Sequence, residues 1–123
     1  DLHSFPTRRS SDLEPGTLAQ ALPEVSEATQ FGIPVWRAGK KSFAWAGYDK
    51  ERLMLSFWVG VDRQAMLTAD PRYRIPAYTG HNGWISLDVT HDCHWDEVRE
   101  LMRFSYRHFA LKRMLNALDR AHA

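Results

Sequence analysis

The most regular set of chemically active side chains is a series of arginines near the carboxyl end of the chain. Arg99, Arg103 and Arg107 are spaced four residues apart, so on a helix they share one face. At about 100° per residue, this face lies roughly 100° to 180° away from an apolar face that contains Val98. The arginines therefore point to solvent, where they can bind phosphates without reading bases. Alternatively they belong to an ordinary solvated face, neutralised by acidic neighbours. These neighbours are Asp96, Glu97 and Glu100.

Further basic residues extend this set of candidate phosphate contacts. Lys112 and Arg113 follow the arginines closely, and Lys40 and Lys41 gather with Arg37 at a predicted hairpin. Over the whole chain, 16 basic side chains stand against 15 acidic ones, for a formal net charge of +1. Because neither sign dominates, the composition excludes a histone-like polycation or an acidic tail.

Tryptophans on one face of a predicted sheet form a second candidate site. The segment from Leu53 to Val59 alternates strictly between two sets of side chains, which is typical of a strand. Leu53, Leu55, Phe57 and Val59 make one set, and Met54, Ser56 and Trp58 belong to the other. The strand predicted from Trp84 to Val89 alternates in the same way, with Ile85, Leu87 and Val89 on one side and Trp84, Ser86 and Asp88 on the other.

If the aliphatic sets face helices, Trp58 and Trp84 share the opposite face. Trp36 or Trp45, and Tyr48, join them there, depending on the register of the strands. Such a face can stack bases, bind a small apolar ligand or pair with a second copy. The alternative is that the loop containing Tyr73 and Tyr78 folds over it as a minor core.

Potential zinc ligands gather before the last long helix. They are His91, Asp92, Cys93 and His94, with His81 farther away. The same position is a helix start, where Asp92 or His94 can cap the N–H groups and Glu97 can complete a capping box. Since neighbouring side chains at 93 and 94 diverge, a tetrahedral site needs another ligand from elsewhere. We therefore expect no metal and no cofactor.

No catalytic motif is present in the sequence. The nucleophile elbow, the phosphate-binding P-loop and the dinucleotide-binding glycine pattern are all missing. Cys93 beside a histidine, or Asp88 with Asp92, lacks a positioned partner. The sole cysteine excludes an internal disulfide, and no apolar stretch approaches the roughly 18 residues that span a bilayer. The expectation is a cytoplasmic protein that is not an enzyme and does not bind membranes.

A framework of alternating helices and strands must position these residues. Helices are predicted over 14–24, from Asp62 as cap to about Ala69, and from about His94 through 121 with a bend near Ala110. Strands are predicted around 35–37, 42–48, 53–59 and 84–89, and residues 72–82 read mostly as a loop. In the strand over 42–48, Phe43 and Trp45 fall on the same side. The buried stripe of the long helix is Val98, Leu101, Met102, Ser105 and Phe109.

Residues 1–13 stand apart from the rest. The run DLHSFPTRRSSDL has no hydrophobic period and predicts disorder. It resembles a translated sequencing adapter and is alternatively a flexible native tail. It lacks the apolar central region of a signal peptide. We therefore expect one domain, over residues 14–123.

Short motifs spread along this domain resemble the MmcQ/YjbR family of small bacterial proteins. They occur in the family order: Ala21-Leu22-Pro23-Glu24, Phe31-Gly32, Gly39-Lys40, Phe43-Ala44, Leu53 with Leu55, Asp70-Pro71, Gly83-Trp84 and Ser105-Tyr106. The resemblance covers nearly all of residues 15–120. It implies an α+β fold with an antiparallel sheet packed on one side by helices, in the order α-β-β-β-α-β-β-α, similar to CyaY-like and secretion-chaperone-like domains.

Proteins of this family are commonly labelled DNA-binding, so the resemblance also implies a function. On this hypothesis the backbone contacts come from basic residues and two tryptophans stack on bases. The candidate residues are Arg99, Arg103, Arg107, Lys112, Arg113, Lys40, Lys41, Trp58 and Trp84. Two alternatives remain open at this point. The aromatic face can serve a protein partner or a homodimer, or a small ligand can bind between the sheet and residues 72–82.

Overall fold

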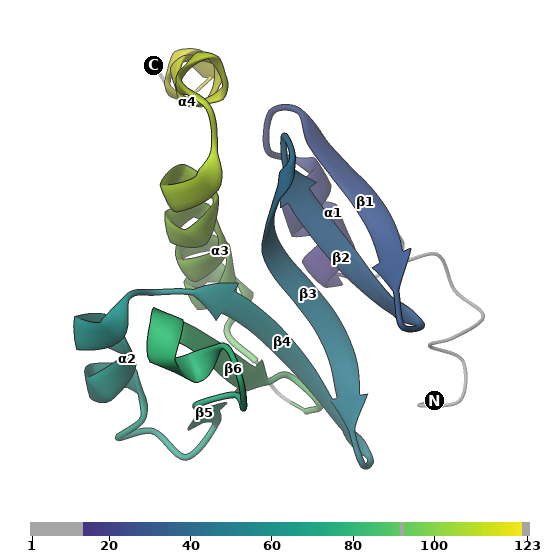
Figure 1. Cartoon of the computed structure of the whole chain (residues 1–123), viewed down its shortest axis with the longest axis vertical. Helices are drawn as coiled ribbons and strands as arrows, with labels where there is room; N and C mark the ends of the chain where they lie inside the picture. Colours follow the sequence, from purple (N-terminus) through teal and green to yellow (C-terminus); the bar gives the residue numbers. More distant parts are fainter. Residues whose placement is uncertain (1–13, 92, 122–123) are drawn as a thin grey trace.

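The computed structural model describes residues 14–91 and 93–121 (Figure 1). The prediction for the first 13 residues therefore lies outside the described chain. Within the described residues a single sheet has the strand order β1-β2-β3-β4-β6-β5. Every neighbouring pair of strands is antiparallel. The predicted α+β class is confirmed.

Strands fill most of the first half of the described chain, and the longest helix lies in the second half. The strands are β1 (Val25–Gln30), β2 (Ile33–Ala38), β3 (Lys41–Asp49), β4 (Arg52–Trp58), β5 (Tyr73–Arg74) and β6 (Trp84–Asp88). The helices are α1 (Glu14–Gln20), α2 (Val61–Leu67), the 3-10 turn η3 (Gly80–Asn82), α3 (Trp95–Phe109) and α4 (Lys112–Ala121). β1 is an additional strand that the alternation does not predict, since its side chains are exposed or half-buried throughout.

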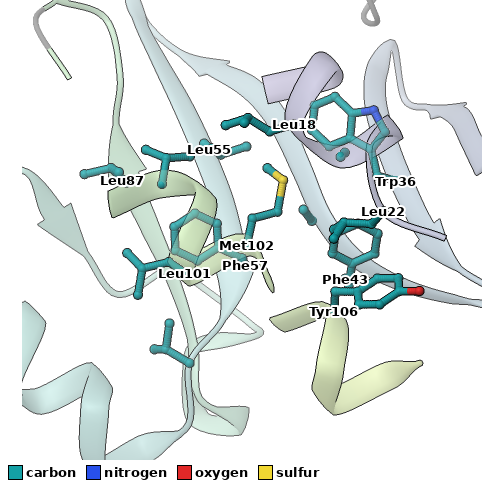
Figure 2. Close-up of a cluster of buried hydrophobic side chains, with 14 of the residues drawn as sticks. Leu18, Leu22, Trp36, Phe43, Leu55, Phe57, Leu87, Leu101, Met102 and Tyr106 are labelled. Carbon is teal, nitrogen blue, oxygen red and sulfur yellow. The ribbon is translucent and has the colours of Figure 1, made fainter. Parts of the chain in front are cut away.

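The hydrophobic core lies between one face of the sheet and helices α1 and α3. The alternation on β4 and β6 is confirmed, because Leu55, Phe57, Ile85 and Leu87 belong to the core cluster, whereas Met54, Ser56, Trp84 and Ser86 are buried outside it. Figure 2 shows these strands meeting Leu101 and Met102 of α3, with Leu18 of α1 beside the indole of Trp36. Trp36 thus belongs to the core and not to the opposite face. The core stripe on α3 includes Tyr106, whereas Phe109 is only half-buried.

A β-bulge between β2 and β3 changes the face of one aromatic side chain. Trp36 pairs with Ala44 and Arg37 with Ser42, so Phe43 is an extra residue between them. Its ring is fully buried and meets the Tyr106 ring edge-on, with centroids 5.5 Å apart (Figure 2). Trp45, beyond the bulge, points to the other face. The expectation that Phe43 and Trp45 share one side is wrong, because strict alternation does not allow for a bulge.

Two helix boundaries also differ from the prediction. α1 ends at Gln20 instead of Glu24, and Glu24 has a left-handed backbone with φ of 55° that no helix continues. The N-cap of α2 is Gly60, with φ of 86°, and Asp62 lies in the first turn. Asp62 is therefore not the cap, although its carboxylate still lies near the positive end of the helix dipole.

Candidate functional site

The tip of the β2–β3 hairpin lies against the start of α4 (Figure 1). A Cβ atom placed on Gly39 would lie 3.8 Å from the side chains of both Leu111 and Met114. Gly39 has φ of 67°, a backbone conformation that glycine adopts without strain in a tight turn. This packing brings residues that are far apart in the sequence to one end of the molecule.

Four of the predicted basic site residues gather at this end. A hollow of about 460 Å³ is lined by Ala38, Gly39, Lys40, Lys41, Phe109, Leu111 and Arg113. Lys112 is exposed beside Arg113. We call this cavity with its basic lining residues Lys40, Lys41 and Arg113, together with the adjacent Lys112, the basic hollow. Its lining is partly apolar, because Phe109 and Leu111 contribute to it.

Most cations of the basic hollow have no carboxylate partner in the described part of the chain. Lys40, Lys41 and Lys112 form no ion pair with any residue that the structure describes. Arg113 is the exception, since its guanidinium donates to both carboxylate oxygens of Glu24 over 2.8 to 3.2 Å. This hydrogen bonding holds the pKa of Glu24 below its usual value.

The predicted arginine stripe on α3 is placed as expected but is largely paired. The guanidinium of Arg99 lies 3.1 Å from Asp96, and that of Arg107 lies 2.7 Å from Asp119 on α4. Arg103 between them is half-buried, with interactions of its own. The stripe borders a groove of about 380 Å³ that also includes Asp96 and Glu100. Its electrostatic field is therefore mixed, and this agrees with the neutralised helix face considered from the sequence.

The tryptophans of the second candidate site form a packed group. The indoles of Trp45 and Trp84 are stacked with centroids 4.3 Å apart, and Trp58 stacks on His108 at 3.5 Å. Phe109 connects the two pairs, at 5.8 Å from Trp84 and 6.4 Å from Trp58. These five residues are the aromatic cluster. Trp84 is only 8% exposed, so most of its surface contacts other parts of the protein.

The loop after α2 borders the open face of the sheet through residues other than its two tyrosines. Tyr73 is buried on the helix side of the sheet, where its hydroxyl donates to Glu97. Tyr78 is 93% exposed. The loop does lie over this face, as in the alternative considered from the sequence, but the tyrosine rings do not form the cover. Instead Ile75, Pro76 and Ala77 border a cavity above that face.

The residues around the start of α3 do not make the capping contacts expected from the sequence. The N-cap is His94, and its side chain makes no capping hydrogen bond. The predicted capping box is absent, because Glu97 accepts from Tyr73 and lies 3.7 Å from Arg72. Burial raises the pKa of the Cys93 thiol, which makes it a poor nucleophile. Among the described residues, which omit Asp92, no group of three potential ligands could hold a metal ion.

Two features of this region do not follow from the sequence pattern. Periodicity assigns Phe109 to the core stripe, yet it borders the basic hollow and contacts the tryptophans as well. Leu111 is 49% exposed at the hollow. Helical periodicity assigns a side to each residue within α3, but Ala110 has extended backbone with ψ of 151°. The chain therefore changes direction there, at the bend predicted near Ala110.

Comparisons with known proteins agree with this architecture. The sequence profile of the family described as YjbR matches residues 20–108. The solved structure of Deinococcus radiodurans protein DR2400, with the family domain DUF419, is similar with a TM-score of 0.68. The match covers 94% of this chain and 91% of that chain at 20% identity, and such a likeness shows the fold alone. No curated protein matches the chain significantly. No helix among the described residues is long and apolar enough to cross a membrane.

Proposed function

The chain belongs to the YjbR family, and on this premise we propose that it is a non-enzymatic DNA-binding protein that contacts the phosphate backbone through the basic hollow. The cations involved are Lys40, Lys41, Lys112 and Arg113. The DNA-binding label that the family resemblance carries points in the same direction. The proposal includes no sequence-specific readout, because lysine side chains on the backbone position a protein without distinguishing bases.

The observation that supports this assignment is the absence of counter-charges among the described neighbours of the three lysines. An exposed ammonium group without a carboxylate partner can neutralise a phosphate and release its counterion at little cost. A guanidinium that is already paired must first lose its partner. Arg99 and Arg107 are in that position, through Asp96 and Asp119. We therefore assign a secondary role to the arginine stripe. It lies beside the bound DNA, and its paired arginines contact phosphates only after they give up their carboxylate partners.

Salt dependence provides the test. Fluorescence anisotropy of a labelled duplex of about 20 base pairs measures Kd between roughly 50 and 200 mM NaCl. The expected result is a steep loss of affinity with salt. The variant with Lys40, Lys41 and Lys112 replaced by glutamine no longer neutralises three of the phosphates. Its plot of log Kd against log salt should be shallower by about 0.9 for each of these phosphates.

Two matched variants remove the same charge elsewhere. One replaces by glutamine Lys50 and Arg52 at the opposite β3–β4 hairpin and Arg74 on β5 beside it. The other replaces the arginines of the α3 stripe. The first should bind like the wild-type protein, and the second should lose less affinity than the lysine variant. Equal weakening by all three variants would mean that total charge alone determines binding, which contradicts the assignment. Absence of salt-sensitive binding by the wild-type protein would overturn the function itself.

A further inference from the structure

A second cavity lies on the open face of the sheet, away from the basic hollow. Its volume is about 400 Å³, within the range of small-molecule sites. The sheet contributes one wall through Trp45, Gly47, Met54, Ser56 and Ser86, and the segment after β5 contributes another through Arg74, Ile75, Pro76 and Ala77. It shares no lining residue with the basic hollow.

The wall formed by residues 75–77 is held in place by the turn that follows it. Gly80 donates its N–H to the carbonyl of Pro76 at 3.1 Å. A Cβ atom on Gly80 would lie 2.3 Å from Cγ2 of Ile75, so only glycine allows this approach. The buried amide of Gln64 on α2 donates to the Gly80 carbonyl at 2.7 Å. The cavity is therefore formed before any ligand arrives.

Two serine hydroxyls supply a hydrogen-bond donor on the sheet wall. Oγ of Ser56 and Oγ of Ser86 are 2.7 Å apart, and both side chains are buried. Only one hydroxyl hydrogen can lie between the two oxygens. The other hydrogen has no acceptor among the described residues. Since both serines line the cavity, this hydrogen is available to a ligand oxygen.

The edge of the cavity carries a cation. The guanidinium of Arg74 lies 3.4 Å from Asp49, and both side chains are about half exposed. A pair that is this long and this exposed is weak. A carboxylate on a ligand can replace Asp49, because a guanidinium accepts a planar carboxylate in a two-point geometry.

We propose that this cavity binds a small planar aromatic acid. The ring lies between the indole of Trp45 and the apolar side chains of Met54 and Ile75. The carboxylate pairs with Arg74, and an oxygen at the other end of the ring accepts from the serine pair. This inference is independent of DNA binding, because the two sites use different residues.

Calorimetric titration of the full chain with 4-hydroxybenzoate tests this proposal, and benzoate, anthranilate and indole-3-acetate complete the set of probes. The expected result is saturable binding to one site. Arg74→Gln should weaken binding by roughly tenfold, as expected for loss of a charge-assisted hydrogen bond. The double variant Ser56→Ala with Ser86→Ala should reduce affinity for 4-hydroxybenzoate more than for benzoate, which lacks the second oxygen.

Arg52→Gln is the matched control, since Arg52 pairs with Asp88 at 3.3 Å and does not line the cavity. It should leave the affinity for all four acids unchanged. The proposal is overturned if none of the acids saturates the protein below about 10 mM. Equal weakening by Arg52→Gln and Arg74→Gln would also overturn it, because attraction by general surface charge would then be sufficient.

Discussion

The two faces of the sheet are built from alternate residues of the same strands but are closed in different ways. On one face Leu55 and Phe57 are fully buried under α1 and α3. On the other, Trp45 and Trp58 are half-buried, and the serine pair borders an open cavity. Helices supply a continuous apolar cover to the first face. The second face is covered by a short segment of loop, by the tryptophans themselves and, at Trp58 and Trp84, by His108 and Phe109 from the end of α3.

This difference indicates which face of the sheet can bind a ligand in a small domain. Burial of the first face supplies the stability that the chain needs. The second face can keep a cavity and polar groups because the fold does not depend on closing it. Mutations on the two faces should therefore differ in the property that they change: stability on the helix side, and binding on the cavity side.

The largest expected effect is loss of stability on the helix side. Phe57→Ala removes a fully buried ring and should lower the free energy of unfolding by about 3–5 kcal/mol. Trp45→Ala on the opposite face should cost less, because that indole is already partly in water. Urea unfolding followed by circular dichroism measures both values. Equal losses for the two variants would contradict the distinction between the faces.

Buried hydroxyl groups sharpen the same comparison with a smaller effect. Ser105 on α3 donates to the carbonyl of Phe43 at 2.6 Å and accepts from the N–H of Trp58 at 3.0 Å. Ser105→Ala leaves both backbone groups without a partner and should cost about 1–3 kcal/mol. Replacing Ser56 and Ser86 together by alanine should be nearly neutral for stability, since both partners of that hydrogen bond are removed at once.

The same urea experiment distinguishes the two outcomes. A double serine variant that is destabilised as much as Ser105→Ala would show that the cavity wall is part of the core. Ser42→Ala on the half-buried side of β3 serves as the control for a serine-to-alanine change within the sheet.

Prediction from sequence works best where one physical rule determines the outcome. Strict alternation places Leu55, Trp58 and Trp84 on the correct sides, because the period of a strand is two. The same rule places Phe43 wrongly, since a bulge between β2 and β3 interrupts the period. Helical spacing places the arginines on one face of α3. It also anticipates Asp96 as a partner of Arg99. It does not reveal the pairing of Arg107, because Asp119 comes from another helix.

The basic hollow shows the same limit. Lys40, Lys41, Lys112 and Arg113 are each candidates from the sequence, but the two lysines of the hairpin are far along the chain from the other two residues. Their association depends on Gly39 approaching α4 and on the change of chain direction at Ala110. Local patterns do not specify how an isolated hairpin and a terminal helix pack together. The cavity is a similar case, because its loop wall has no periodic signal.

The smallest expected effect comes from the Glu24–Arg113 pair, which lies at the edge of the basic hollow and belongs to neither face of the sheet. Hydrogen bonding to Arg113 lowers the pKa of Glu24 below its usual value in the folded protein. The pair therefore stabilises the fold above the unfolded pKa, and this contribution disappears as the pH falls through the lowered folded value. Both side chains are largely exposed, so Glu24→Gln should lower the melting temperature only slightly at neutral pH. The difference from wild type should vanish once the pH has fallen below the lowered folded pKa of Glu24.

The same variant connects stability to DNA binding. Glu24 is the one carboxylate that the described structure pairs with a cation of the basic hollow. Its neutralisation leaves Arg113 available to a phosphate, so Glu24→Gln should bind the labelled duplex more tightly and with a steeper salt dependence than wild type. Glu51→Gln, at the exposed β3–β4 turn, changes the net charge equally and should leave both quantities closer to wild type. If the two variants strengthen binding by the same factor, the gain comes from net charge and the hollow has no special role.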